Sequence, residues 1–422
     1  MNVVKRDGRK VPFNQDRIRT AIIKAFESVD NDIDQYALDI ADSISISISK
    51  LADHKEFNIE DIQDLVETKL MATKRKDVAK SYIEYRLKRD RERDRNSRLF
   101  KDIAKKLQAT DIQNQNANVD EGSFGGRIGE ATNAMMKKYA LDFCMSDLAR
   151  ENHLNNMIYT HDLDHYAVGN HNCLSIPFDD LLANGFNTRQ TDVRPAQSVS
   201  TAFQLVAVIF QLQSLQQFGG VAATHLDWTM APYVRKSFYK HYCDGLKYIE
   251  SKKANKEIKL AINKEESKDY GINNTDIYNH KEAYQYAMDM TEKEIYQAVE
   301  GMYHNLNTLQ SRSGNQLPFT SINYGTCTLL EGRMVTKAIL EVSIKGIGKL
   351  HKTPIFPCGI FQCMKGVNRK KGEPNYDLFQ LALRSTAQRL YPNYVNVDWS
   401  VNEGYDRDDP KTYCSTMGRR KL

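Results

Sequence analysis

The seven cysteines of this 422-residue sequence do not form the pairs expected of a metal or redox motif. None has the C-x-x-C spacing of a zinc ribbon or a thioredoxin-like site, and the nearest two, Cys358 and Cys363, are separated by four residues. The count is odd, which in a chain without secretory features favours free thiols over a disulfide framework. We therefore predict no metal ligands here, and any redox role of a cysteine must come from its local surroundings.

The sequence also lacks long apolar runs. None approaches the roughly 18 residues needed to span a bilayer, and the N-terminal MNVVKRDGRK is not followed by the apolar region of a signal peptide. These absences predict a cytoplasmic protein without a membrane partner. The formal net charge of +5, from 59 basic and 54 acidic residues, is too small to indicate direct nucleic-acid binding, although it suits an anion of nucleotide size.

Residues 1–95 have the pattern of a compact, mostly helical module. A short strand at Val3-Val4 leads into a turn with Gly8, which can adopt the positive φ of a tight hairpin. Asn14 is the expected N-cap of a first amphipathic helix, and Asn58 is the expected N-cap of a second. Between them, the alternating isoleucines and serines of residues 44–49 predict a strand.

Three segments of this module, VVKRDGRKVPFNQDRIRTAIIKAF, FNIEDIQDLVE and AKSYIEYRLKR, resemble the ATP-cone, the regulatory nucleotide-binding domain of ribonucleotide reductases. The resemblance implies that ATP or dATP binds as an allosteric effector. Fixed cations and backbone N–H groups beside a glycine turn suit a triphosphate. The implied effector-binding residues lie in the hairpin: Val4, Lys5, Arg6, Gly8 and Lys10.

A connector is expected between this module and the rest of the chain. Residues 86–107 form a dense mixed-charge run that should continue the last helix of the module, and the interleaved acidic residues argue against nucleic-acid binding. Residues 113–126, rich in Asn, Gln and Gly, are typical of a loop. The predicted organisation is therefore a cone at 1–95, a connector and loop at 96–126, and a catalytic region at 127–422.

The stretch HDLDHYAVGNHNCLSIPF at 161–178 is centred on Cys173. Alternation within a short strand places Cys173 and Ser175 on one face and Leu174 and Ile176 on the other, so the thiol can face a cavity. The alternative is a buried, inert cysteine, because free cysteines are among the most buried residues. His161 and His165 nearby are better explained as structural residues.

Helical and strand-like patterns alternate through the remainder of the chain. Helices are expected at 131–151, 198–218, 292–309 and 377–391, and strands within 311–325 and 354–368. The lysine-rich segment 248–279 is expected to be a surface excursion. Strands separated by helices predict an α/β barrel or sheet.

Several motifs in this region resemble the catalytic subunit of anaerobic (class III) ribonucleoside-triphosphate reductases, which are glycyl-radical enzymes. They are HDLDHYAVGNHNC, QQFGG, MAPYV, SRSGNQLPFTSINYGT, TPIFP with KGVN, PNYDLFQLAL and RLYPNYV. The resemblance implies a ten-stranded α/β barrel of the glycyl-radical type, of which this chain holds an incomplete part. It also implies a homodimer that binds ribonucleoside triphosphates as substrates and deoxynucleotides as effectors, and a radical-SAM activating enzyme as partner.

The resemblance also implies a role for Cys173. In the family, a radical on a glycine is passed to a cysteine in a finger loop, whose thiyl abstracts the ribose 3′ hydrogen. A second cysteine on a neighbouring strand helps the 2′ hydroxyl to leave, and Cys173 matches that second thiol. A thiol held at fixed geometry on a strand is a suitable proton donor for such a step.

The C-terminal tail departs from the family pattern. Residues 412–418, TYCSTMG, approach the family's Met-Gly-Cys-Arg finger loop, but the sequence continues as Arg419-Arg420-Lys421-Leu422, and Cys414 is not at the matching position. The expected thiyl cysteine, the zinc-binding cysteines and the radical glycine are therefore expected in a missing C-terminal part. We interpret the chain as the N-terminal portion of a split or intron-interrupted reductase that is inactive alone. A non-catalytic nucleotide-binding regulatory fragment is the alternative, and the N-terminal cone argues against a reductase-unrelated enzyme of the pyruvate formate-lyase type.

Overall fold

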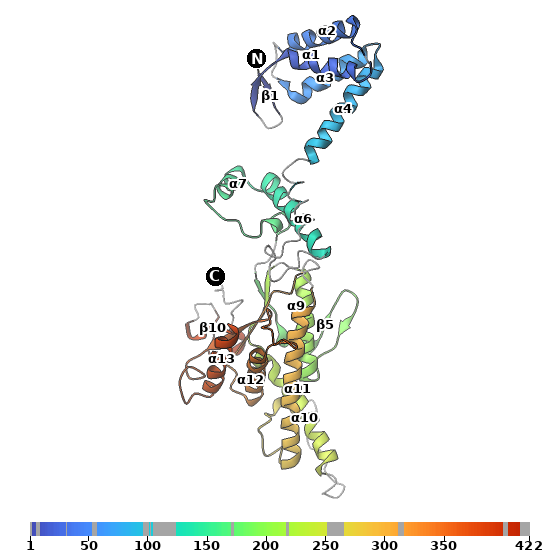
Figure 1. Cartoon of the computed structure of the whole chain (residues 1–422). Helices are drawn as coiled ribbons and strands as arrows, with labels where there is room; N and C mark the ends of the chain where they lie inside the picture. The colour runs from blue at the N-terminus through green and yellow to red at the C-terminus, as the bar shows by residue number, and fades with distance from the viewer. Residues whose placement is uncertain are drawn as a thin grey trace. The chain divides into compact units, whose positions relative to one another are not determined.

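The computed structural model describes residues 2–5, 9–30, 32–52, 57–95, 101, 103, 124–169, 173–216, 219–250, 266–310, 316–399 and 404–413 (Figure 1). The chain divides into two compact units, Met1–Asp102 and Ile103–Leu422. Each unit is considered by itself.

Within its described residues, the first unit combines a small sheet with the four helices α1 to α4. Its sheet has the order β2-β1-β3, in which β1 pairs antiparallel with β2 and parallel with β3. The strands are β1 (Asn2–Val4), β2 (Lys10–Pro12) and β3 (Phe57–Asn58). The helices are α1 (Gln15–Glu27), α2 (Gln35–Ala52), α3 (Ile59–Ala72) and α4 (Lys76–Arg95). The prediction of a mostly helical N-terminal region is confirmed.

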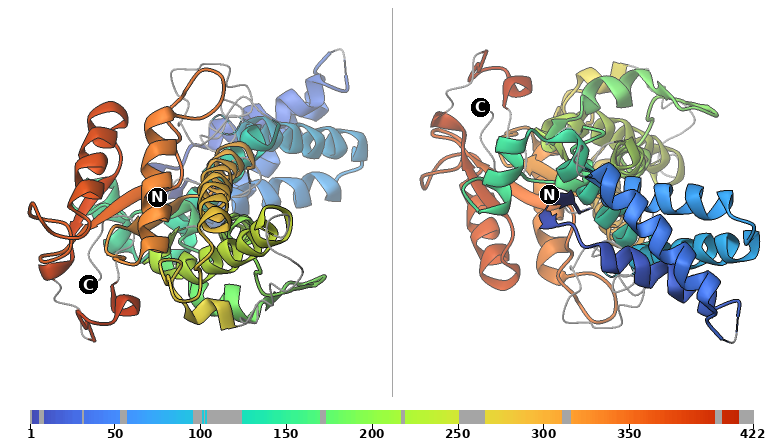
Figure 2. Two further views of the ribbon diagram at one scale, coloured as in Figure 1. Left: turned by 90° about the horizontal axis from the view of Figure 1, so that it is seen from below. Right: turned by 90° about the horizontal axis from the view of Figure 1, so that it is seen from above.

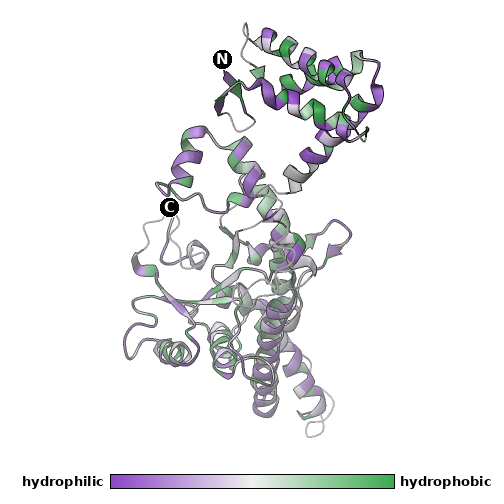
Figure 3. Cartoon of the chain, turned by 45° about the horizontal axis from the view of Figure 1, so that its top comes forward, coloured by the Kyte–Doolittle hydropathy of each residue, from purple (hydrophilic) through white to green (hydrophobic). Residues whose placement is uncertain are grey.

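The two predicted N-caps lie where the sequence indicates. The side chain of Asn14 accepts a hydrogen bond from the backbone N–H of Arg17 at 3.3 Å, which satisfies one of the unpaired donors at the start of α1. Asn58 precedes α3, and its backbone N–H donates to the carboxylate of Asp61 at 3.1 Å. Apolar residues of α1 and α3 face one shared core, and both helices carry polar residues on the opposite face (Figure 3).

The predicted strand at residues 44–49 is wrong, because these residues lie within α2. Ile44 and Ile48 are four residues apart and are buried in the core of the unit, whereas Ile46 is 45% exposed. A hydrophobic pattern with a period of two residues therefore also contains an i, i+4 pair, which lies on one face of a helix. Tertiary packing of that face overrides the strand preference of isoleucine.

The second unit begins with short helices. They are α6 (Phe124–Tyr139), a π-helical turn η2 (Ala140–Cys144), α7 (Asp147–Leu154) and a 3₁₀ turn η3 (Leu163–His165). The helical prediction for 131–151 is largely confirmed, with an interruption at Met145-Ser146. The predicted loop at 113–126 is wrong for residues 124–126, which start α6, and its remainder lies outside the described residues.

A five-stranded sheet forms the centre of the second unit, and every pair of neighbouring strands in it is parallel. In spatial order its strands are β10 (Asn393–Asn396), β9 (Cys358–Cys363), β8 (Thr320–Tyr324), β7 (Gly220–Ala223) and β4 (Cys173–Ser175). The α/β prediction is confirmed. These five strands are half of the ten that the reductase resemblance implies.

Helices connect the strands and cover one face of the sheet (Figures 1 and 2). They are α8 (Phe178–Asn184), α9 (Val199–Gln216), α10 (Leu226–Tyr248), α11 (Lys281–Thr308), α12 (Leu330–Lys345) and α13 (Tyr376–Arg389). A two-stranded ribbon, β5 (Phe186–Asn187) and β6 (Asp192–Val193), follows α8. The helices predicted at 198–218, 292–309 and 377–391 correspond to α9, α11 and α13.

The predicted surface excursion at 248–279 is wrong for its C-terminal part. Ile272 and Tyr278 are buried with Phe238 and Tyr242 of α10 in a separate small core. Residues 251–265 lie outside the described residues. Among the described helices, none combines the length and the apolar character needed to cross a membrane.

Candidate functional site: the polar face of the sheet

The strand register places Cys173 on the face of the sheet that the helices do not cover. Ser175 pairs with Ala222, Ala222 with Ser321, and Ser321 with Cys358, so these side chains share one face. Cys173 lies two residues before Ser175 on the same strand and therefore on the same face. The predicted strand and its alternation are confirmed.

The opposite face is apolar. Ile176 packs against the large core that contains Val221, Ile322 and Phe361, and this core is closed by side chains of α9 to α13. The backbone N–H of Ile176 donates to the carbonyl oxygen of Ala222 at 2.9 Å, which extends the pairing of β4 with β7. Cys173 is half-buried, and the structure shows it as a free thiol. Its partner in the register is Gly220, so no side chain stands opposite the sulfur on β7.

Buried amides and hydroxyls cross the polar face further along the strands. Asn323 donates from Nδ2 to the carbonyl oxygen of Ala223 at 3.0 Å. Gln362 donates from Nε2 to the carbonyl oxygen of Thr224 at 2.9 Å and accepts from the hydroxyl of Thr326 at 3.3 Å. These bonds hold the ends of β7, β8 and β9 together, because each one ties a side chain of one strand to another of these strands or to the residues that follow it.

Asp227, at the start of α10, anchors the turn that follows β8. Its carboxylate is fully buried and accepts the backbone N–H groups of Gly325 at 2.8 Å and Cys327 at 2.9 Å. Burial raises the pKa of Asp227, and these two hydrogen bonds act in the opposite direction. The side chains of Asn368 and Asn375 both donate to the carbonyl oxygen of Gly325, so the turn is held from three sides. The sequence analysis did not single out these three residues, although all of them lie in or beside its quoted motifs.

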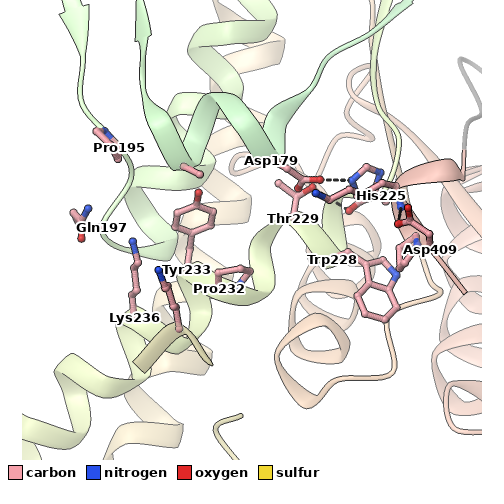
Figure 4. A pocket seen from close by; sticks show the side chains of 14 residues that line it. Asp179, Pro195, Gln197, His225, Trp228, Thr229, Pro232, Tyr233, Lys236 and Asp409 are labelled. Carbon is pink, nitrogen blue, oxygen red and sulfur yellow. Dashed lines mark hydrogen bonds and ion pairs between the residues drawn. The ribbon is translucent and has the colours of Figure 1, made fainter. Parts of the chain in front are cut away.

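A cavity of about 610 Å³ lies beside α8 and α10 (Figure 4). His225 donates from Nε2 to the carboxylate of Asp179 at 2.7 Å, and its Nδ1 lies 2.9 Å from the hydroxyl of Thr224. Burial is the largest single influence on Asp179 and would raise its pKa, but the hydrogen bond and the charge of His225, with smaller contributions from Thr229 and Lys411, together lower the pKa. Trp228 and Tyr233 supply apolar walls, and three lysines also line the cavity: Lys236, Lys268 and Lys411.

This cavity has the chemistry of a site for an anionic ligand that also carries an apolar group. Its lysines are far apart in the sequence, at 236, 268 and 411, so no local spacing could have identified it. Among the described residues, no group of three or more His, Cys, Asp or Glu side chains is arranged to hold a metal ion.

Of the five predicted effector-binding residues, Val4, Lys5 and Lys10 lie on or beside β1 and β2 of the first unit. Val4 pairs with Lys10 across β1 and β2, and the backbone N–H of Lys5 donates to the carbonyl oxygen of Arg9 at 2.9 Å. Lys10 is exposed, whereas Val4 and Lys5 are half-buried. Arg6 and Gly8 lie outside the described residues. The structure therefore brings Val4, Lys5 and Lys10 together on neighbouring strands.

Residues of α1 line two further cavities in the same unit. One, of about 330 Å³, lies between α1 and Tyr85 of α4, and its lining also includes Arg17, Thr20 and Lys24. The other, of about 570 Å³, includes Lys24, Tyr85 and Lys88. Lys24 and Tyr85 are common to both. Sequence reasoning missed these residues, because it treated α1 and α4 only as packing elements.

The histidines near Cys173 are not brought into a cluster. His161 pairs with the carboxylate of Asp162 at 2.6 Å and is exposed, and His165 lies 3.5 Å from the carboxylate of Asp164. Neither contact joins Cys173. Cys414 and the TYCSTMG finger-loop resemblance from residue 414 onward lie outside the described residues.

The sequence also matches known proteins. Residues 115–421 match the family model described as anaerobic ribonucleoside-triphosphate reductase, and residues 1–91 match the ATP cone domain. The chain is 32% identical over 403 residues to the anaerobic ribonucleoside-triphosphate reductase of Haemophilus influenzae, covering 94% of this chain and 52% of that protein. The Escherichia coli protein of the same name is likewise 32% identical, with 95% and 52% covered.

A solved structure of the anaerobic ribonucleotide reductase from Thermotoga maritima, in complex with dATP and CTP, is similar over 71% of this chain and 47% of that chain, with 14% identity and a TM-score of 0.45. The chain spans about half the length of the curated relatives that it matches. Because the reductase model matches residues 115–421, well over half of the sequence, this chain belongs to the anaerobic ribonucleoside-triphosphate reductase family.

Proposed function

We propose that this chain supplies the regulatory cone and half of the catalytic barrel to an enzyme that reduces ribonucleoside triphosphates to deoxyribonucleoside triphosphates in the cytoplasm. The observation that carries the proposal is the position of Cys173 on the polar face of a five-stranded parallel sheet, in a chain of this family. The cone, at 1–95, regulates the enzyme by binding ATP or dATP, and residues 96–126 connect it to the catalytic region. The enzyme acts as a homodimer.

Cys173 is the proton donor in this proposal. Its thiol delivers a proton to the 2′ hydroxyl of the ribose as that group leaves, a step that requires a donor held within hydrogen-bond reach. Pairing of β4 with β7 holds the sulfur in place, and the absence of a side chain at Gly220 allows the ribose to approach. The radical glycine supplies the one-electron chemistry. With the structural zinc, it is expected in the half of the reductase that this chain does not span.

The activity test compares two cysteines on opposite faces of the sheet. Reductase that contains this sequence together with the rest of the barrel is activated anaerobically by its radical-SAM partner and assayed for deoxynucleotide formation. Cys173→Ser is expected to lower the rate by about 100-fold or more, the range that a positioned proton donor contributes. Cys363→Ser is the matched control, because Cys363 packs against the apolar core and lies away from the polar face.

Retention of activity by Cys173→Ser, with the same unfolding midpoint as the unsubstituted chain, would exclude the proposed role. If the unsubstituted reductase is fully assembled but forms no deoxynucleotide, the alternative of a non-catalytic regulatory fragment is favoured instead.

The effector assignment is tested by titration calorimetry of the chain with ATP and with dATP. Replacing both Lys5 and Arg6 by alanine removes two cations from the hairpin, and we expect affinity to fall about tenfold or more, since charged hydrogen bonds contribute roughly 1.5–3 kcal/mol each. Lys50→Ala is the control, because Lys50 is exposed in the last turn of α2. Unchanged affinity in the double variant would contradict the assignment of the hairpin.

A further inference from the structure

A thiol and a phenol are in contact beside the polar face of the sheet, and the proposed reaction uses neither of them. Cys358 begins β9 and, by strand register, shares that face with Ser321 and Cys173. Its Sγ lies 3.7 Å from the Oη of Tyr391, which precedes β10. Both side chains are half-buried. We refer to Cys358 and Tyr391 as the thiol–phenol pair.

The hydrogen bonds of the pair direct the phenolic hydrogen toward the sulfur. A thiol has one hydrogen, and Cys358 donates it to the carbonyl oxygen of Ile355, which lies 3.9 Å from Sγ. The O–H of Tyr391 is therefore the donor in the contact between Oη and Sγ. Burial raises the pKa of Cys358 and raises the pKa of Tyr391 to about 12, so both groups keep their hydrogens at neutral pH.

A neighbouring hydroxyl indicates that a ligand lies beside this thiol. Ser321 is the partner of Cys358 in the register of β8 and β9, and its side chain is fully buried. Its Oγ makes no hydrogen bond in the part of the chain that the structure describes. A buried hydroxyl without a partner is unfavourable, and a bound ligand with hydrogen-bonding groups relieves that cost. A ribonucleotide at Cys173, on the same face, carries several such groups.

We propose that the thiol–phenol pair is a hydrogen-atom donor that removes stray radicals from a ribonucleotide bound on the polar face. This inference rests on the proposed function, which forms a carbon-centred radical on the ribose. The S–H bond of Cys358 breaks, and its hydrogen atom forms a C–H bond at the nucleotide carbon. The resulting thiyl takes the phenolic hydrogen atom of Tyr391, which restores the thiol and leaves a tyrosyl radical. Each step moves one hydrogen atom, so atoms and electrons balance.

Position separates the pair from two other oxidisable side chains nearby. Cys363 lies on the same strand as Cys358 but packs against the apolar core. Tyr394 lies on β10, three residues after Tyr391, and its ring packs against Phe361 of that core with centroids 6.1 Å apart. A donor held in place beside the reacting atom transfers its hydrogen without a search, an advantage that these two residues lack. They therefore provide a matched thiol control and a matched phenol control.

The main test counts the turnovers that the enzyme completes before it is inactivated. Reductase that contains this sequence together with the rest of the barrel is activated anaerobically and supplied with a ribonucleoside triphosphate. Cys358→Ser and Tyr391→Phe are each expected to complete several-fold fewer turnovers, because stray radicals then damage the nucleotide or the protein. Cys363→Ser and Tyr394→Phe are expected to match the unsubstituted enzyme. Incubation without nucleotide separates this effect from folding, since a structural defect would shorten the lifetime there too.

The ligand contact is tested separately at Ser321. Ser321→Ala removes the buried hydroxyl, and we expect the KM for the ribonucleoside triphosphate to rise several-fold, with a smaller change in kcat. An unchanged KM would contradict the placement of the nucleotide beside Cys358.

Electron paramagnetic resonance of samples frozen during turnover identifies the radical. We expect a tyrosyl signal that accumulates in the unsubstituted enzyme and in Tyr394→Phe, and that is lost in Tyr391→Phe and in Cys358→Ser. Equal turnover counts, or a tyrosyl signal that persists in Tyr391→Phe, would overturn the inference, while deoxynucleotide formation in the same samples leaves the proposed function intact. If the unsubstituted enzyme forms no deoxynucleotide, the proposed function fails, and this inference fails with it.

Discussion

The two faces of the five-stranded sheet are formed by the same strands but differ in their contacts, which are apolar on one face and hydrogen-bonded on the other. Phe361 and Gln362 are neighbours on β9 and point to opposite faces. Phe361 is buried among Tyr324, Phe379 and Tyr394, in edge-on and tilted ring contacts. Gln362 is equally buried, but its contacts are hydrogen bonds to Thr224 and Thr326.

This difference between the two faces shows which of them contributes more to the free energy of folding. The apolar face gains free energy by removing large side chains from water, whereas the polar face mainly avoids a loss by pairing its buried groups. Because the polar face contributes less to stability, packing constrains the identity of its residues less, and a residue needed for a reaction is tolerated there. Cys173 lies on that face.

The largest effect is expected on the apolar face. Phe361→Ala leaves a cavity among aromatic neighbours, and we expect the free energy of unfolding to fall by about 3–5 kcal/mol. Urea unfolding followed by tryptophan fluorescence measures it, because Trp228 and Trp399 both lie in the second unit. A loss below about 1 kcal/mol would mean that the core relaxes around the site and that the two faces differ less than their packing indicates.

A smaller effect is expected from the neighbouring residue. Gln362→Leu keeps a similar volume but removes the side-chain donor to the carbonyl oxygen of Thr224 and the acceptor for the hydroxyl of Thr326, which still accepts from the indole of Trp228. We expect a loss of about 1–3 kcal/mol in the same unfolding assay, the cost of leaving buried polar groups unpaired. A change as large as that of Phe361→Ala would contradict the division of roles between the faces.

The smallest effect is expected at Ser321, on the polar face of β8. Its hydroxyl is buried and makes no hydrogen bond in the part of the chain that the structure describes. Ser321→Ala should therefore leave the unfolding free energy of this chain within about 0.5 kcal/mol, or raise it slightly. A clear destabilisation would reveal a partner for the hydroxyl and would sharpen the account of the polar face.

Local signals in the sequence were sufficient for many elements. The spacing of Ile18, Ile22 and Phe26 after Asn14 predicts α1, because a helix start needs a cap and its core face repeats every three to four residues. The strand at Cys173 follows in the same way from alternation. The isoleucines at 44–49 show the limit of this reasoning, since a short pattern of period two also contains pairs four residues apart.

The sequence by itself determined the α/β class, the helical N-terminal region and, through its motifs, the family. It also placed Cys173 and Ser175 on a common face, because alternation in a strand depends only on backbone geometry. Only the tertiary structure decided which residues meet across long separations in the chain. Strand register aligned Ser175 with Ser321, burial brought Asp227 to the turn after β8, and Lys236 and Lys411 came to line one cavity. Such contacts depend on how parallel strands are ordered and how their connecting helices pack, and neither is contained in any local pattern of residues.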